Sequence, residues 1–139
     1  MTRWDKLFID IALRVSQESK STRLKVGAVC VRENIVLTTG FNGSVSKRGS
    51  DVLEEDGVTT PDTIHAEENI ILFAAREGIS IKGSTLYVTV NPCRHCSALL
   101  AQAGVVEVKF LNEYRDLTGL EKLKQYGVKI TKLDEQDTV

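Results

Sequence analysis

The alternation of strand-like and helix-like segments after residue 64 constrains the fold more than any other feature of the chain. The segments rich in β-branched and apolar residues are predicted to be strands, namely residues 85–90, 105–111 and 128–133. The residues before each of these strands favour helix, over residues 65–76, 93–103 and 117–126. A glycine closely follows each of these predicted helices. Strands that alternate with helices predict a sheet that is parallel over at least part of its width.

The first 64 residues predict a different arrangement. Apolar side chains in residues 3–18 recur at the spacing of one helical face, whereas residues 26–31 and 35–41 are β-branched runs that predict a hairpin. Residues 43–62 are rich in Gly, Ser and acidic residues without clear periodicity, and loops of such length are often functional or mobile. The fold class is therefore α/β, with a five-stranded mixed sheet flanked by helices.

No linker or repeat divides residues 1–139, so we expect one domain, with a frayed acidic tail at residues 134–137. The 18 basic and 19 acidic side chains give a formal net charge of −1, and no basic excess favours a long nucleic acid as partner. No apolar run approaches the roughly 20 residues needed to span a bilayer. The N-terminus lacks the apolar stretch of a secretory signal, so a cytoplasmic protein is expected.

Two short motifs carry the residues that could perform chemistry, His65-Ala66-Glu67 and Pro92-Cys93-Arg94-His95-Cys96. Zinc prefers nitrogen and sulfur ligands in a tetrahedron, and a catalytic zinc keeps one position open for water. His65, Cys93 and Cys96 supply three such ligands, at two helix starts that are expected at one end of the sheet. Glu67 is close enough to reach a water on the metal, which is the position of a general base.

A Cys-x-x-Cys pair alone could also be a structural zinc knuckle or a redox dithiol. A redox motif needs no His-x-Glu element at a separate helix start, which disfavours that interpretation. A closed structural site needs a fourth ligand, and the spare candidates are Cys30 and His95. Cys30 lies in the middle of a predicted strand among valines, where a free cysteine is usually a small buried hydrophobic residue. His95 is expected to point away from the helix face that Cys93 and Cys96 share. The pattern therefore favours an open, catalytic site for one Zn²⁺.

With these motifs the chain resembles the dCMP deaminase branch of the cytidine and deoxycytidylate deaminase superfamily, including the enzymes of T-even bacteriophages. The resemblance runs from about Val15 to Ile130, and its most specific segments are Thr39-Gly40-Phe41-Asn42-Gly43 and His65-Ala66-Glu67-Glu68-Asn69-Ile70. It implies the three-layer cytidine-deaminase-like fold. T-even relatives have a longer insertion at residues 44–64 with ligands for a second zinc, and this chain has no Cys or His there, so one zinc per chain is expected.

The resemblance further implies hydrolytic deamination of dCMP to dUMP and ammonia. A water activated by zinc would add to C4 of cytosine, and Glu67 would carry the protons. The backbone of Ala66 would hold the base edge, and Asn42 would contact sugar or base, with Asn69 as a further candidate for the substrate site. The weakly ranked candidates for the 5′-phosphate are basic residues, Arg23, Lys25 and Arg115, followed by Lys47 and Arg48.

In this family the element Gly40-Phe41-Asn42-Gly43 is also tied to allosteric control, with dCTP as activator and dTTP as inhibitor. Phe41 stands where tyrosine is usual, so the ring is kept and the hydroxyl is lost. A nucleotide effector could bring Mg²⁺ with it. The resemblance also implies a homo-oligomer, with a hexamer favoured, and the host cytoplasm as location if the protein is viral.

Three other functions stay open at this point. A deaminase of another small nucleoside or base, such as cytidine or cytosine, would use the same motifs. A tRNA adenosine deaminase is disfavoured by the balanced charge. A non-catalytic zinc or nucleotide-sensing module would keep the metal ligands without needing Glu67.

Overall fold

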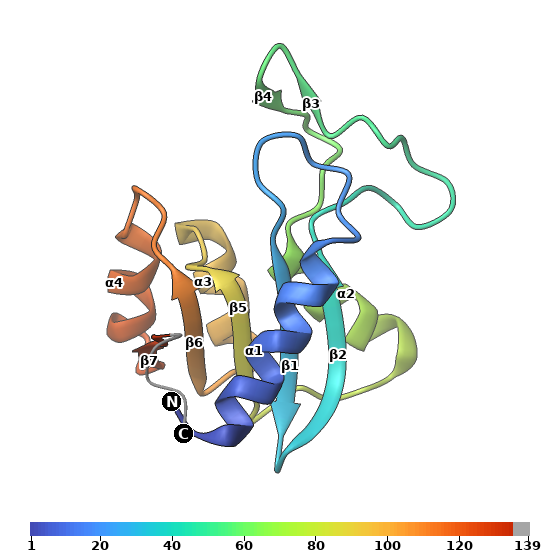
Figure 1. The fold of residues 1–139 in the computed structure, drawn as a ribbon. Coiled ribbons are helices and arrows are strands. Elements are labelled where there is room, and N and C mark those ends of the chain that lie inside the picture. The colour runs from blue at the N-terminus through green and yellow to red at the C-terminus, as the bar shows by residue number, and fades with distance from the viewer. Residues whose placement is uncertain (135–139) are drawn as a thin grey trace.

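A five-stranded sheet in the order β2-β1-β5-β6-β7 forms the centre of the molecule, as the computed structural model shows for residues 1–134 (Figure 1). Strand β1 pairs antiparallel with both β2 and β5, whereas β5, β6 and β7 pair in parallel. These strands are β1 (Gly27–Arg32), β2 (Ile35–Phe41), β5 (Thr85–Val90), β6 (Glu107–Asn112) and β7 (Lys129–Lys132). The mixed sheet predicted from the sequence is confirmed. Of the predicted frayed tail, residues 135–137 lie outside the described part of the chain.

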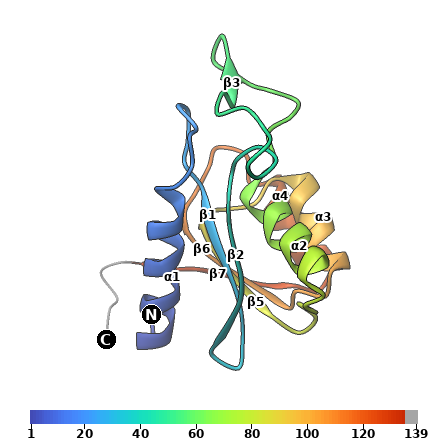
Figure 2. The ribbon, with the colours of Figure 1, turned by 90° about the vertical axis from the view of Figure 1, so that its right-hand side faces the viewer.

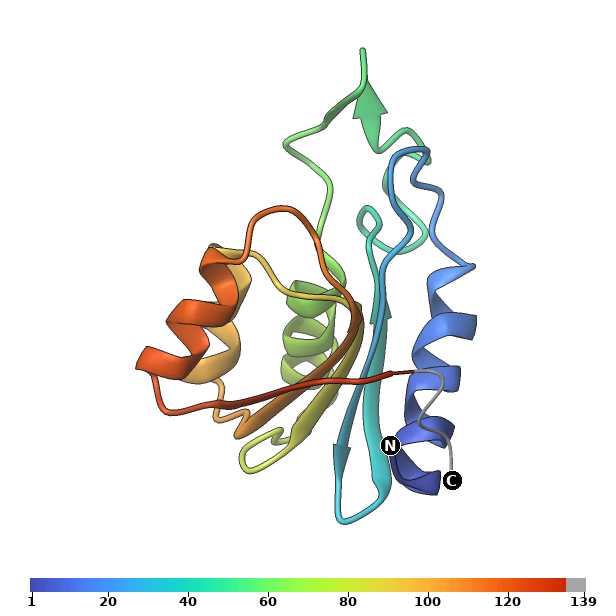
Figure 3. The same cartoon turned by 60° about the vertical axis from the view of Figure 1, so that its left-hand side comes forward.

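Helices cover both faces of this sheet and complete three layers (Figures 2 and 3). The helices are α1 (Arg3–Ser16), α2 (Ala66–Glu77), α3 (Arg94–Gln102) and α4 (Thr118–Gln125). Helix α1 lies on one face, where Phe8, Ile9 and Ala12 pack against the sheet. The other three helices lie on the opposite face, over a larger apolar core that includes Ile70, Leu100 and Leu123. No helix within residues 1–134 is long and apolar enough to span a membrane.

The segment predicted as a plain loop, residues 43–62, also contains a small hairpin, which corrects the prediction. Its strands are β3 (Glu54–Glu55) and β4 (Val58–Thr59), and they pair antiparallel. The turn between them is Asp56-Gly57, and both residues have positive φ, 52° and 77°. Asp-Gly is a typical two-residue hairpin turn, but strands this short show no periodicity in the sequence. The hairpin projects beyond the sheet at the end where β5 finishes (top of Figure 1).

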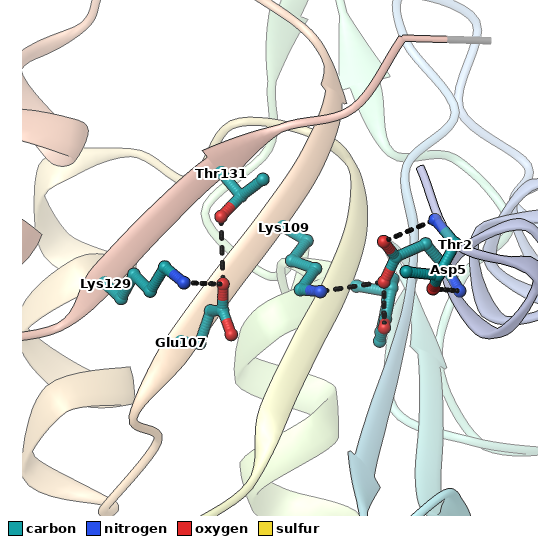
Figure 4. A network of polar contacts seen from close by, with 7 residues as sticks. Thr2, Asp5, Glu107, Lys109, Lys129 and Thr131 are labelled. Carbon is teal, nitrogen blue, oxygen red and sulfur yellow. Dashed lines mark hydrogen bonds and ion pairs between the residues drawn. The ribbon is translucent and has the colours of Figure 1, made fainter. Parts of the chain in front are cut away.

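On the α1 face, a buried carboxylate joins the helix to the sheet (Figure 4). Asp5 accepts hydrogen bonds from Tyr87 Oη and Lys109 Nζ, both at 2.7 Å, and its backbone N–H donates to Thr2 Oγ1 at 3.1 Å. Burial opposes ionisation of Asp5, but the hydrogen bonds outweigh it and lower the pKa of the carboxyl to about 2. The carboxylate is therefore ionised and fully paired at neutral pH.

Candidate active site

The predicted zinc ligands lie at the starts of two helices on the same face of the sheet. His65 directly precedes α2, and its backbone N–H donates to the Glu68 carboxylate at 2.8 Å. Cys93 directly precedes α3, and its Sγ accepts a hydrogen bond from the backbone N–H of Cys96 at 3.5 Å. Strand β5 ends at Val90, so Cys93 follows the end of this strand within a few residues. The structure therefore places the two helix starts together at one end of the sheet, as expected from the sequence.

The three ligand atoms have the spacing of a zinc site. Nδ1 of His65 lies 3.7 Å from Sγ of Cys93 and 3.3 Å from Sγ of Cys96, and all three atoms lie within 4.8 Å of one another. Tetrahedral zinc bonds of about 2.0 Å to nitrogen and about 2.3 Å to sulfur place such atoms roughly 3.6 Å apart. The donor set therefore fits zinc, and within residues 1–134 it is the one group of His, Cys, Asp and Glu side chains with this spacing.

Neither spare candidate joins the three ligands. Cys30 is fully buried in β1, where its Sγ lies 3.0 Å from Ser84 Oγ. The side chain of His95 is 71% exposed, and its Nε2 lies 3.8 Å from the Glu68 carboxylate. The structure thus brings together three protein ligands, which is the number that a catalytic zinc uses when it keeps one position for water.

The ligand set favours one negative charge at the start of α3. Hydrogen bonding with Cys96 and His65 lowers the pKa of the Cys93 thiol to about 4. The hydrogen bond with Cys93 raises the pKa of His65 to about 9, and interaction with Cys93 also raises the pKa of the Cys96 thiol. The unpaired N–H groups at a helix start add to the preference for a thiolate there. Because zinc needs neutral His and ionised Cys, metal binding to this set releases protons.

Glu67 is buried beside the ligands, with 5% of its surface exposed, and it lines the same pocket as His65, Ala66 and Cys93. Burial raises the pKa of its carboxyl to about 7. Ala66 is the first residue of α2, and the first N–H groups of a helix have no partner inside the helix. The pocket therefore offers a carboxyl group for proton transfer and a backbone donor for a ligand.

The two predicted asparagines lie in different places. Asn42 lines the pocket, but its amide already holds the backbone, because Oδ1 accepts from Val26 N–H at 2.9 Å and Nδ2 donates to the Leu24 carbonyl at 2.8 Å. Asn69 is buried, donates to the Phe41 carbonyl at 2.8 Å, and lines a separate hollow. Asn42 is thus brought to the site, whereas Asn69 connects α2 to the end of β2.

Of the predicted phosphate ligands, only Arg23 lines the pocket within the described residues. Its guanidinium donates to Thr59 Oγ1 at 3.2 Å and to Tyr114 Oη at 3.3 Å. Lys25 and Arg115 are exposed outside the pocket lining, and the Arg115 guanidinium stands 5.8 Å from the centre of the Tyr114 ring. Lys47 and Arg48 line other hollows. Arg23 is therefore the candidate that the structure brings to the pocket, and the other four lie outside its lining.

The Gly40–Gly43 element lies where β2 approaches α2. A Cβ on Gly40 would come within 2.8 Å of the Ala66 carbonyl oxygen, so glycine permits the close packing of strand and helix. Phe41 and Gly43 line the separate hollow together with Lys20 and Lys47. This element therefore borders the active-site pocket through Asn42 and, through Phe41, a second hollow that Glu18 and Asp51 line as well as the two lysines.

Sequence reasoning missed several residues that shape the pocket. Asn91 is buried just before Pro92, where its Oδ1 accepts from Tyr114 N–H and its Nδ2 donates to the Asp116 carbonyl at 3.1 Å. Gly119 of α4 packs against the Pro92 carbonyl oxygen so closely that a Cβ would collide with it. The position of Asn91 at a strand end beside the cysteine motif was a usable signal, whereas the contact of Gly119 is not visible in a sequence.

Comparison with known proteins decides the family. The profile for the cytidine and deoxycytidylate deaminase zinc-binding region matches residues 2–112. The chain belongs to this family. The deaminase is 36% identical over 124 residues to the deoxycytidylate deaminase of Mycobacterium phage D29, covering 79% of this chain and 95% of the relative. It is 33% identical over 147 residues to the deoxycytidylate deaminase of Enterobacteria phage T4, covering 76% of each chain.

A solved relative supports the same assignment in three dimensions. The dCMP deaminase of cyanophage S-TIM5, in complex with dCMP and dUMP, matches this deaminase with a TM-score of 0.91 and 39% identity. The match covers 94% of this chain and 97% of the cyanophage chain. The predicted family, the predicted fold class and the prediction of a zinc-dependent deaminase are therefore confirmed.

Proposed function

We propose that this deaminase hydrolyses dCMP to dUMP and ammonia, with one Zn²⁺ per chain held by His65, Cys93 and Cys96. The observation that carries the proposal is the cluster of three ligand atoms within 4.8 Å of one another, beside the pocket that His65, Cys93 and the buried Glu67 line. The similarity to phage enzymes named deoxycytidylate deaminases supports the choice of substrate.

The protein groups have separate tasks in this reaction. Zinc, when bound, supplies a water of lowered pKa as the nucleophile. Glu67 takes a proton from the attacking water, passes it to N3 of the base, and then protonates the amine that leaves C4 as ammonia. The backbone N–H of Ala66 holds the base edge, and Asn42 orients the pocket wall beside the sugar. The C4–O bond forms first, and the C4–N bond then breaks as Glu67 carries the second proton of the water from the C4 hydroxyl to the amine. The products are therefore dUMP and ammonia.

The position of Arg23 favours a nucleoside monophosphate over a free base or nucleoside. Its guanidinium lies in the lining of the same pocket as Glu67, in reach of a substrate group that extends toward the solvent. Arginine binds phosphate through several parallel hydrogen bonds, so it is suited to this task. We therefore assign the 5′-phosphate to Arg23 and leave Lys25 and Arg115 in lesser roles.

The direct test measures ammonia release by zinc-loaded protein with dCMP, dCTP, cytidine, deoxycytidine and a tRNA stem-loop. We expect the highest kcat/KM with dCMP. Preference for cytidine or deoxycytidine would indicate a nucleoside deaminase, and preference for the stem-loop would indicate a tRNA enzyme. No release from any of them, with zinc bound, would favour a non-catalytic module. Metal analysis is expected to give one zinc per chain.

A second part of the proposal concerns regulation. In the hollow beside Phe41 and Gly43, Lys20 and Lys47 would bind the phosphates of dCTP or dTTP, next to the acidic Glu18 and Asp51 that also line it. A triphosphate bound there would carry Mg²⁺ with it. Activation by dCTP and inhibition by dTTP in a dCMP titration would support this role, and an unchanged titration curve would contradict it.

We also propose that the protein works as a homo-oligomer, with a hexamer favoured, in the cytoplasm. This proposal rests on the resemblance to the dCMP deaminase branch. Sedimentation analysis of the zinc-loaded protein with and without dCTP tests the oligomeric state, and a monomer under both conditions would contradict it.

A further inference from the structure

The hairpin β3–β4 contacts Arg23 at two points. The carboxylate of Glu54 accepts hydrogen bonds from the backbone N–H groups of Thr22 at 3.1 Å and Arg23 at 3.2 Å, and from the hydroxyl of Ser21. The hydroxyl of Thr59 accepts from the Arg23 guanidinium at 3.2 Å. The hairpin therefore holds both the backbone and the head group of the same arginine.

The pairing of the hairpin explains how it does so. Glu54 and Thr59 are direct partners across the two strands. Partners in an antiparallel pair send their side chains to the same face, so one acid and one hydroxyl reach Arg23 together. The tight Asp56-Gly57 turn keeps the two strands in this register.

A third contact comes from the far side of the pocket. Tyr114 Oη lies 3.3 Å from the Arg23 guanidinium, and the loop that carries Tyr114 is held by buried Asn91. Arg23 thus stands where three separate segments of the chain meet. An exposed arginine normally samples many rotamers and loses that freedom when it binds phosphate, whereas a side chain that is already held loses less.

We propose that Glu54 is a positioning residue that acts through Arg23 and makes the pocket prefer a nucleotide with a 5′-phosphate over the unphosphorylated nucleoside. This inference rests on the proposed dCMP deaminase function. Glu54 is itself negative and lines the same pocket, so it could in principle repel a phosphate. Its carboxylate faces the donors of residues 21–23, however, and these hydrogen bonds make positioning the dominant effect.

The two effects change KM in opposite directions, which makes the proposal testable with Glu54→Gln. We expect this variant to raise KM for dCMP about tenfold, because a charge-assisted set of hydrogen bonds is weakened, with kcat within about twofold of wild type. The ratio of kcat/KM for dCMP to that for deoxycytidine falls by the same factor. Glu55→Gln is the matched control, since Glu55 is the exposed neighbour on the same strand, and it is expected to keep the wild-type ratio. A lower KM for dCMP in Glu54→Gln would show repulsion and overturn the proposal.

A double-variant cycle separates positioning from a general loss of structure. If Glu54 acts through Arg23, then Glu54→Gln adds no further loss of dCMP selectivity to Arg23→Gln. An equal loss in both backgrounds would overturn the proposal. Thr59→Val removes only the hydroxyl that holds the guanidinium, and it is expected to raise KM for dCMP about threefold. Thermal unfolding of each variant identifies any that fail to fold, and Thr59→Val then supplies the decisive measurement.

The same data distinguish this inference from the function on which it rests. If the wild-type protein does not deaminate dCMP, the proposed function fails. If the wild type does so and Glu54→Gln and Thr59→Val both keep its KM, the function stands and the positioning role of Glu54 is wrong.

Discussion

Two carboxylates, Glu67 in α2 and Asp5 in α1, are almost equally buried on opposite faces of the sheet, with 5% and 6% of their surfaces exposed. Their protonation behaviour is opposite. Burial raises the pKa of Glu67 to about 7, whereas for Asp5 the hydrogen bonds from Lys109, Tyr87 and Thr2 outweigh burial and lower the pKa to about 2. Glu67 is also more deeply enclosed than Asp5, so the pKa of a buried acid depends on its hydrogen-bond partners as well as on its depth.

The difference separates the face that we propose to be catalytic from a stabilising one. Glu67 borders a pocket and keeps its carboxyl available, so it suits proton transfer. Asp5 is saturated by fixed donors, so it suits the connection of α1 to β5 and β6. Changes on the α2 and α3 side should alter activity, and changes around Asp5 should alter stability alone.

The largest effect is expected for Cys96→Ser, which removes a buried side chain that we propose as a zinc ligand. A hydroxyl is a poor zinc ligand, so the variant should lose stoichiometric zinc and all measurable deamination. Metal analysis after gel filtration and an ammonia assay measure both quantities. Cys30→Ala is the control, because Cys30 is a buried cysteine outside the ligand set, and it should keep zinc and activity. Full activity in Cys96→Ser would refute the ligand assignment.

Glu67→Gln should show a smaller but still large effect, limited to chemistry. The amide cannot carry the proton, so kcat is expected to fall by about a thousandfold, while zinc content stays at the wild-type level. The free energy of unfolding should not decrease, since no stabilising ion pair is lost. If Glu67→Gln retained wild-type kcat with zinc bound, Glu67 would not be the proton-transfer group, and its raised pKa would have no catalytic role.

The metal end of the pocket could be predicted from sequence for a local reason. His65, Cys93 and Cys96 lie at or beside helix starts, and Glu67 follows His65 in the first turn of α2. Short-range spacing therefore carries most of the geometry of this end, and the strands and helices of the sheet follow from periodicity.

The mouth of the pocket depends on distant contacts and could not be predicted. Arg23 was one basic residue among several candidates until the structure placed it 3.2 Å from Thr59 and 3.3 Å from Tyr114, which are 36 and 91 residues away along the chain. Glu54 lay in a segment without periodicity. Asp5 likewise reaches Lys109 across 104 residues. Such pairs become visible only after the chain has folded, because no local pattern specifies the partner.

Asp5→Asn should lower stability and leave catalysis intact. The pKa of Asp5 falls from an ordinary 3.8 to about 2 on folding, which corresponds to about 2 kcal/mol of stabilisation at pH 7. Because the folded pKa is the lower one, this stabilisation is complete above the unfolded pKa and disappears as the pH falls through about 2. Urea unfolding of wild type and variant at several pH values measures the difference, which should shrink between pH 4 and pH 2.

Zinc release at low pH would distort that measurement, since acid protonates the ligands. The unfolding experiments should therefore use protein freed of metal by a chelator at every pH. Deamination by zinc-loaded Asp5→Asn at pH 7 should equal that of wild type. A difference in stability that stays constant down to pH 2 would show that the lost contribution is packing and not charge.

The smallest effect is expected for Lys129→Met. This variant tests whether an ion pair on the Asp5 face stabilises the protein less when its lysine is exposed. Lys129 Nζ lies 3.8 Å from Glu107 Oε2 beside the Asp5 network (Figure 4), but its side chain is 74% exposed, against 19% for Lys109. Glu107 also accepts from Thr131 Oγ1 at 2.9 Å, so it keeps a partner after the substitution. The free energy of unfolding should change by less than about 0.5 kcal/mol, because water screens such a pair. A loss as large as that of Asp5→Asn would mean that ion pairing stabilises this face whatever the burial of the lysine, and the contrast between paired buried and paired exposed groups would fail.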